Sequence, residues 1–224
     1  KLELNQKDVI LDELQDLAAW PRLRTVKILM LDNNEFGDEG VELLAGSEAL
    51  AKLHTLSLAH NKLSDRALSS LARSPVLTRL RVLFLQYNRI GPAGMQALAE
   101  SETLAGLEML YAKVNPLGNA GVKNLAASGR LRSLKELYLE RVRLENSGLE
   151  ALCDSPILDT VEKLYLGDNR LDEQAVDLIA QSPHLKNLVT LDLGKNPIHA
   201  AAQGLKEKLL DSPHLSRFKF LHLD

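Results

Sequence analysis

The stretch Leu53-His54-Thr55-Leu56-Ser57-Leu58-Ala59-His60-Asn61-Lys62-Leu63 decides the fold of this chain. Leucines alternate with other residues in its first half, a pattern typical of a strand with one buried side. Helical spacing follows at Ala67, Leu68, Leu71 and Ala72, which would line one face of a helix. The stretch therefore predicts a unit of one strand followed by one helix.

This unit recurs every 27 residues along the chain. The leucine at the centre of the strand gives the first column: Leu29, Leu56, Leu83, Leu110, Leu137, Leu164 and Leu191. Two more columns keep the same interval, one running from Phe36 to Ile198 and one from Leu50 to Leu185. Several columns with one period indicate a solenoid, in which neighbouring units supply the core that no unit can build alone.

The repeats organise the chain as a single domain over residues 1–224, with no linker and no shift in composition. Residues 1–25 form a partial unit, 26–187 hold six 27-residue units, 188–217 form a seventh unit with about three extra residues near its helix, and 218–224 form a terminal strand. The chain does not start with Met, and Leu2 and Leu4 begin in the middle of the motif. We therefore expect a segment upstream of Lys1.

Strand–helix units repeated in register predict an α/β fold in which a parallel sheet lies on one side and the helices lie on the other. Strands pack about 4.8 Å apart whereas helices need about 10 Å, so the stack should curve with the sheet inside. We predict a right-handed solenoid, a horseshoe arc with eight or nine inner strands. The strands are expected at 28–32, 55–59, 82–86, 109–113, 136–140, 163–167 and 190–194.

Composition restricts the classes of partner. The 27 basic and 30 acidic side chains give a formal net charge of −3, which is no electrostatic footprint for nucleic acid or an anionic membrane. No apolar run approaches the length of a membrane span. Cys153 is the one cysteine, so no internal disulfide forms and no oxidising compartment is needed. We expect a cytoplasmic monomer or weak oligomer, with a secreted effector as the alternative.

Two polar columns have structural explanations. Asparagine holds one position in Asn34, Asn61, Asn88, Asn115, Asn169 and Asn196, where its amide can bond backbone groups as each strand ends. Val142 interrupts this column, and nearby Ala112 replaces a core leucine. A serine column past each helix, from Ser47 to Ser182, suits loop backbone groups.

Residues that would carry catalysis are missing from these patterns. No base accompanies the serines, Cys153 occupies a column otherwise filled by alanine, and the six histidines share no ligand spacing. No phosphate loop, carboxylate pair or triad is identifiable. The sequence predicts no catalytic residue, no cofactor and no metal ligand, and so no enzyme.

The motif Leu53-x-x-Leu56-x-Leu58-x-x-Asn61-x-Leu63 resembles the leucine-rich repeat, and this resemblance covers essentially the whole chain. The continuation Gly40-Val41 with Leu44-Ala45 is similar to the ribonuclease-inhibitor-like subclass, and the unit ending at 180–185 resembles bacterial members of it. The resemblance implies a horseshoe that binds proteins on its concave face.

Folding alone does not explain one column on the predicted concave face. Between the inward leucines it reads Met30, Ser57, Phe84, Tyr111, Tyr138, Tyr165, Asp192 and His222. Strand propensity and ring stacking favour tyrosine there to some extent, but a contiguous aromatic patch usually marks an interaction surface. We predict that the partner binds at Phe84, Tyr87, Met109, Tyr111, Tyr138, Tyr165, Glu140, Arg141, Lys163 and Asp168.

Three functions fit this pattern. The first is a non-enzymatic module that binds a protein partner on its concave face. The second is a regulator of a small GTPase, as similar horseshoes can be, with Arg141 and Arg143 as the candidate groups. The third is the substrate-recognition segment of a larger bacterial effector.

Overall fold

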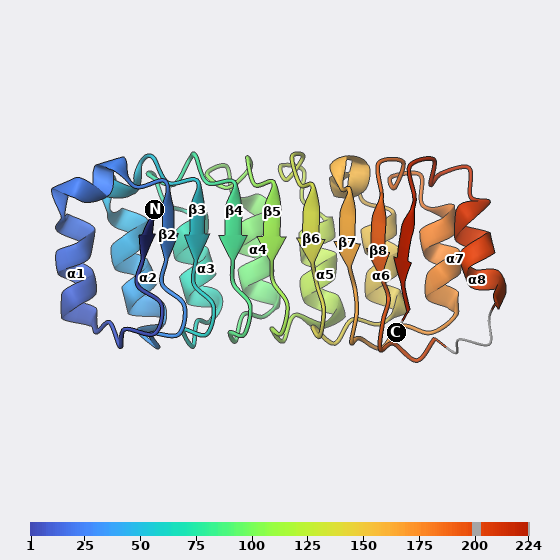
Figure 1. Cartoon of the computed structure of the whole chain (residues 1–224), viewed down its shortest axis with the longest axis horizontal. Coiled ribbons are helices and arrows are strands. Elements are labelled where there is room, and N and C mark those ends of the chain that lie inside the picture. Colours follow the sequence, from blue (N-terminus) through green and yellow to red (C-terminus); the bar gives the residue numbers. More distant parts are fainter. Residues whose placement is uncertain (199–202, 224) are drawn as a thin grey trace.

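A single parallel sheet runs the whole length of the molecule, with its strands ordered β1 to β9 as in the chain (Figure 1). The computed structural model describes residues 1–198 and 203–223. The sheet is open, because β1 and β9 form its two edges. The strands are β1 Leu2–Glu3, β2 Ile28–Met30, β3 Thr55–Ser57, β4 Val82–Phe84, β5 Met109–Tyr111, β6 Glu136–Tyr138, β7 Lys163–Tyr165, β8 Thr190–Asp192 and β9 Phe220–His222.

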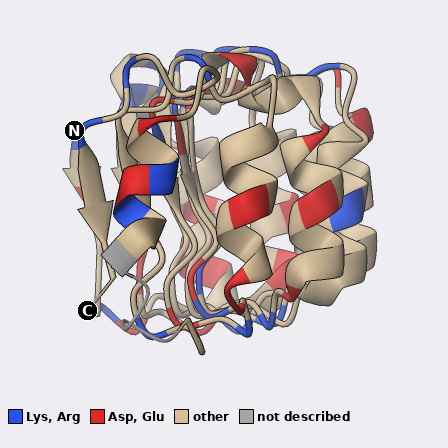
Figure 2. Ribbon diagram, turned by 90° about the vertical axis from the view of Figure 1, so that its right-hand side faces the viewer, with Lys and Arg blue, Asp and Glu red and all other residues tan. Residues whose placement is uncertain are grey.

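Helices cover one face of this sheet and leave the other face, here called the open face, without a covering layer (Figure 1). Asp and Glu are prominent on the helices, while many Lys and Arg lie in the loops along the edges (Figure 2). In the described residues the helices are α1 Leu11–Ala19, α2 Gly37–Gly46, α3 Asp65–Ala72, α4 Pro92–Glu100, α5 Gly118–Ala126, α6 Asn146–Cys153, α7 Gln174–Gln181 and α8 Gln203–Leu210. None of them is long and apolar enough to cross a membrane.

Equivalent positions of successive units pair directly across the sheet. Leu29 pairs with Leu56 and Leu56 with Leu83, so the central leucines share one register. The strands are three residues long where five were predicted, because they end two residues early. Backbone bonds nevertheless continue past the strand ends, with the Leu31 N–H donating to the Ser57 oxygen at 2.9 Å. The loops thus keep the register of the strands.

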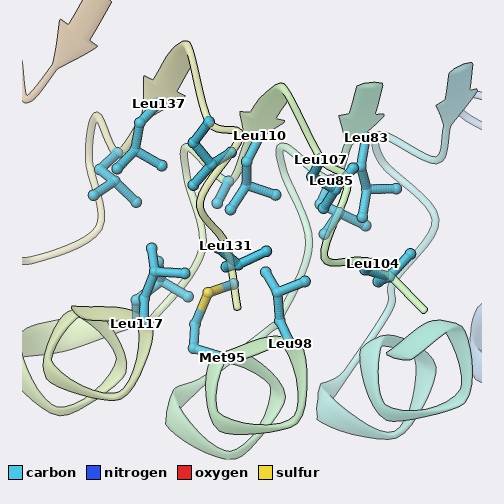
Figure 3. Close-up of a cluster of buried hydrophobic side chains, with 14 of the residues drawn as sticks. Leu83, Leu85, Met95, Leu98, Leu104, Leu107, Leu110, Leu117, Leu131 and Leu137 are labelled. Carbon is cyan, nitrogen blue, oxygen red and sulfur yellow. The ribbon is translucent and has the colours of Figure 1, made fainter. Parts of the chain in front are cut away.

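The core lies between the sheet and the helices. Leu83, Leu110 and Leu137 extend from their strands toward Met95 and Leu98 of α4 (Figure 3). The strand leucines are fully buried, as the alternating pattern predicts. Helix burial also follows the predicted face, since Ala67, Leu68, Leu71 and Ala72 are the buried residues of α3. The parallel sheet with helices on one side confirms the predicted fold class.

The asparagine column forms a ladder of amide bonds. Asn88 Nδ2 donates to the oxygens of Leu58 and Leu85, and Asn115 Nδ2 donates to those of Leu85 and Ala112. The Leu85 carbonyl thus accepts two amides, and this sharing recurs along the ladder. Val142 interrupts it, as predicted.

The interruption leaves no carbonyl without a donor. Ala112 O accepts only Asn115 Nδ2, and Leu139 O accepts only Asn169 Nδ2, so each of these two carbonyls keeps one amide. The Val142 N–H itself donates to Asn169 Oδ1 at 3.0 Å. The vacancy therefore removes a second donor from two carbonyls, and it removes the amide oxygen that would accept the Asn115 N–H as Asn88 Oδ1 accepts the Asn61 N–H.

Each serine of the serine column donates to a carbonyl near the end of the helix in the preceding unit, which fits the expected structural role. Ser74 Oγ donates to the Ala45 oxygen at 2.5 Å, and Ser182 Oγ donates to the Cys153 oxygen at 2.6 Å. These bonds satisfy carbonyls that a helix terminus leaves free. Cys153 is buried in the small-residue column, and burial raises the pKa of its thiol to about 12. The extra residues expected near the helix of the seventh unit fall in part on 199–202, outside the described residues.

Candidate functional site

Four aromatic rings stack in a row on the open face of the sheet. Phe84, Tyr111, Tyr138 and Tyr165, here called the aromatic row, pair in register on β4 to β7. Their ring centroids are 4.4, 3.7 and 4.3 Å apart, with interplanar angles of 27°, 12° and 7°. The predicted stripe therefore exists as one continuous stack.

Stacking determines which parts of the rings can meet a partner. Both faces of Tyr111 and Tyr138 are covered by neighbouring rings, and all four side chains are half-buried. Ring edges and hydroxyls are what the middle of the row offers to solvent. Cross-strand stacking thus accounts for part of the tyrosine content. Phe84 and Tyr165, at the two ends, each stack on one ring only in the described structure.

A polar network holds the later half of the row. The Tyr138 hydroxyl donates to Glu136 Oε2 at 2.8 Å, and Lys163 Nζ bonds Glu136 Oε1 at 2.9 Å. Glu136 therefore fixes a phenol and an ammonium at once. Glu136 is not among the site residues predicted from the sequence, although its spacing of two from Tyr138 places both side chains on the same face of β6.

Burial and hydrogen bonds shift the pKa values of Tyr111, Tyr138 and Lys163. Burial raises the pKa of Tyr138, and hydrogen bonds with Tyr111 and Glu136 raise it further. Burial also raises the pKa of Tyr111, which the hydrogen bond with Tyr138 partly offsets. The hydrogen bond to Glu136 raises the pKa of Lys163. At neutral pH Tyr111 and Tyr138 are therefore neutral phenols beside the charged Lys163.

Glu140 lies half-buried on the open face, two residues beyond Tyr138. Burial raises the pKa of its carboxyl group, and its nearest cation is Lys113 Nζ at 4.0 Å. Its Oε2 atom is buried without a hydrogen-bond partner. This oxygen is an acceptor that the chain itself leaves unused.

Three predicted site residues lie apart from the row, at the loop edge of the sheet. Tyr87, Arg141 and Asp168 occupy equivalent positions just after their strands, each with a positive φ of 59°, 56° and 54°. Tyr87 stacks on His60, with ring centroids 4.1 Å apart. Tyr87 therefore makes its ring contact with His60 and not with the row, which it was expected to widen. Of the flanking residues, Met109 and Lys163 lie within β5 and β7, on the side where those strands begin.

Arginines gather at the same loop edge. Arg141 Nε lies 3.6 Å from Asp168 Oδ2, and both line a shallow depression of about 480 Å³ together with Arg143 and Arg170. Arg170 pairs with Glu145 at 3.4 Å. The two arginines named for a GTPase-regulating role thus share one surface, away from the aromatic row. No group of three or more His, Cys, Asp or Glu that could hold a metal occurs in the described part of the chain.

Comparison with known proteins identifies the class of the fold. A leucine-rich repeat model matches residues 22–45, 49–72 and 76–99, and a second leucine-rich repeat model matches residues 133–153. These matches fall within the repeat units, and the parallel sheet with its helical layer has the solenoid fold of leucine-rich repeat structures. No curated protein matches the chain significantly.

Solved structures share this fold at low sequence identity. An internalin (inlF) from Listeria monocytogenes is similar with a TM-score of 0.57 and 22% identity over 94% of this chain. The ectodomain of the receptor kinase GASSHO1/SCHENGEN3 from Arabidopsis thaliana, in complex with CASPARIAN STRIP INTEGRITY FACTOR 2, is similar with a TM-score of 0.50 and 19% identity over 92% of this chain. The chain spans 50% of the internalin chain and 22% of the receptor ectodomain.

Proposed function

We propose that this chain is a non-enzymatic protein-binding module whose partner docks on the open face of the sheet, over the aromatic row. The observation that carries the proposal is a stack of four half-buried rings on a face that no other layer of the described chain covers. Amphipathic aromatic side chains of this kind are enriched at the centres of protein interfaces.

Folding alone does not require this stack. The same column holds Met30, Ser57 and Asp192 in other units, and each of them pairs in register with its neighbours. An aromatic ring is therefore optional at this position of the sheet. Four consecutive rings are a feature of the surface, which supports selection for binding.

Charged pairs lie beside the row and at the loop edge of the sheet, and both positions suit the rim of an interface. Lys163 with Glu136, and Arg141 with Asp168, present both signs of charge to solvent. Rim charges of this kind affect orientation and association rate more than affinity. The plant receptor ectodomain, whose fold is similar, is in complex with CASPARIAN STRIP INTEGRITY FACTOR 2, which supports a ligand-binding role for the fold.

The same proposal includes the repeat subclass of the chain, its origin, its site of action and the side on which the partner docks. A helix after each of the inner strands β2 to β8 supports the ribonuclease-inhibitor-like subclass, and the unit endings support a bacterial origin. The lone buried cysteine supports a cytoplasmic site of action. The concave side of the arc is the place proposed for the partner.

Differential capture tests the proposal. The native protein and Tyr138→Ala are immobilised in parallel, and the proteins retained from the source organism are identified and quantified. A partner of the aromatic row should be retained by the native protein and depleted on Tyr138→Ala. The matched control is Tyr87→Ala, which removes the one tyrosine outside the row. Equal retention by all three would contradict docking on the row.

A further inference from the structure

The aromatic row ends at Tyr165 in a ring face that no other ring of the described chain covers. One face of Tyr165 stacks on Tyr138, with an interplanar angle of 7°. The opposite face is therefore directed toward β8, where Asp192 holds the paired position. The stack stops because a carboxylate stands where the next ring would be.

The carboxylate of Asp192 lies next to this ring face, whereas that of Glu140 lies just past β6, on the other side of Tyr165. Asp192 Oδ1 accepts the Gly194 N–H at 2.8 Å, and Asp192 makes no ion pair within the part of the chain that the structure describes. The charge of Asp192 adds to the effect of burial in raising the pKa of Glu140. Glu140 in turn has a lysine no closer than 4.0 Å and one buried oxygen without a partner. This region therefore has more negative charge than its own cations neutralise.

Two residues beside these groups are glycines, which carry no side chain. Gly167 and Gly194 occupy the position where earlier units carry Gln86, Lys113 and Glu140. A Cβ atom at Gly167 would lie 3.3 Å from both carboxylate oxygens of Asp192 and 3.2 Å from the Gly194 oxygen. The absence of a side chain at Gly167 thus leaves the room that the half-buried Asp192 carboxylate occupies.

We propose that this end of the row, formed by Tyr165 and Asp192, receives an arginine side chain of the protein partner. The inference rests on the proposed function and specifies the chemistry of the partner. A planar guanidinium can lie on the free face of Tyr165 and donate parallel hydrogen bonds to Asp192.

The residues at the Phe84 end of the row indicate which kind of side chain the partner should carry there. Phe84 is bordered by Val82 and Met109, which are half-buried apolar side chains on the open face. Four strand steps separate Phe84 from Asp192, a distance of about 19 Å. An extended segment covers that distance with about six residues. The partner segment should therefore carry an apolar side chain at one end and arginine about six residues away.

A titration with a small probe tests this site without the partner. Blocked arginine (N-acetyl-arginine N-methylamide) is added to the isotope-labelled protein, with the neutral blocked citrulline as its matched probe. The Gly194 amide reports on the Asp192 carboxylate, and the Tyr165 ring protons report on stacking. Arginine should shift both sets of signals, and Asp192→Asn should weaken its binding roughly fivefold, the loss expected for one exposed ion pair.

Asp32→Asn is the matched control variant, since Asp32 is another carboxylate of the open face without an ion pair in the described structure, but with no ring beside it. Arginine binding should survive this substitution. Equal shifts with citrulline, or no response at Gly194, would overturn the inference. Binding unaffected by Asp192→Asn would overturn it as well. None of these results bears on whether the partner docks on the aromatic row. That question is tested separately by partner capture with Tyr138→Ala.

Discussion

The rings of Tyr111 and Tyr138 stack with their centroids 3.7 Å apart and their planes within 12° of each other. This contact joins β5 to β6 on the open face, opposite the leucine core. The same tyrosines therefore serve two purposes, since they stabilise the sheet and form the proposed binding surface. Aromatic pairs of this kind contribute about 0.5–1.5 kcal/mol beyond the burial of their area.

Stability should depend on where in the row a ring is removed. Tyr138→Ala deletes two stacking contacts and one hydroxyl bond, whereas Tyr165→Ala deletes one stacking contact. We expect Tyr138→Ala to lower the free energy of unfolding by about 2 kcal/mol, and Tyr165→Ala by about half as much. Urea denaturation measures both values. Equal and negligible losses would mean that the stack does not support the fold.

Alkaline pH should destabilise the protein partly through Tyr138. Its folded pKa is raised by burial above the usual tyrosine value of about 10. Its contribution to stability is therefore complete below about pH 10 and is lost as the pH rises further, because only the unfolded state ionises readily. The Tyr138→Phe variant, which has no hydroxyl, should lose less stability between about pH 9 and 11. Parallel curves for the two proteins would show that Tyr138 titrates normally.

Placing an asparagine at position 142 tests whether the gap in the asparagine ladder affects the stability of the fold. Val142 is fully buried, and the carbonyls of Ala112 and Leu139 each have one amide donor where others have two. We expect Val142→Asn to be neutral or to stabilise the fold by about 1 kcal/mol. The reverse change, Asn115→Val, should open a second gap and destabilise. A large drop in melting temperature for Val142→Asn would mean that the vacancy is apolar.

The thiol of Cys153 should be inert in the folded protein. It lies in the buried small-residue column, and its pKa of about 12 keeps it protonated at pH 8. Dithionitrobenzoate should label it slowly under native conditions and completely in 6 M guanidinium, a concentration on the order of that which unfolds hyperstable proteins. Fast labelling of the native protein would place Cys153 at the surface and contradict the packing of α6.

The sequence predicts the backbone plan well because each unit repeats the same physical pattern. The leucines at 56 and 83 are buried in register, and the gap at Val142 appears where the asparagine column breaks. Strand ends were predicted two residues too late, since the alternation continues through Leu58 although regular pairing with the neighbouring strands stops at Ser57. Local turn geometry decides that boundary, and periodicity does not encode it.

The candidate site was predicted less completely than the fold. The column of rings follows directly from the repeat, so the row itself could be foreseen. The loop-edge position of Tyr87 could not, because a positive φ just after the strand re-aims the side chain away from Phe84. The bonds that Glu136 makes to Tyr138 and Lys163 depend on side-chain conformations that a single sequence does not specify.

The central claim is that the partner docks on the aromatic row, and the dissociation constant of the captured partner tests it most directly. Calorimetric titration compares the native protein with Tyr111→Ala and Tyr138→Ala, each confirmed as folded by circular dichroism. Glu150→Ala, on the exposed face of α6, is the control. We predict about thirtyfold weaker binding for both tyrosine variants, as for a hot-spot loss of about 2 kcal/mol, and no change for the control. Tyrosine variants that bind as tightly as the native protein would contradict the account.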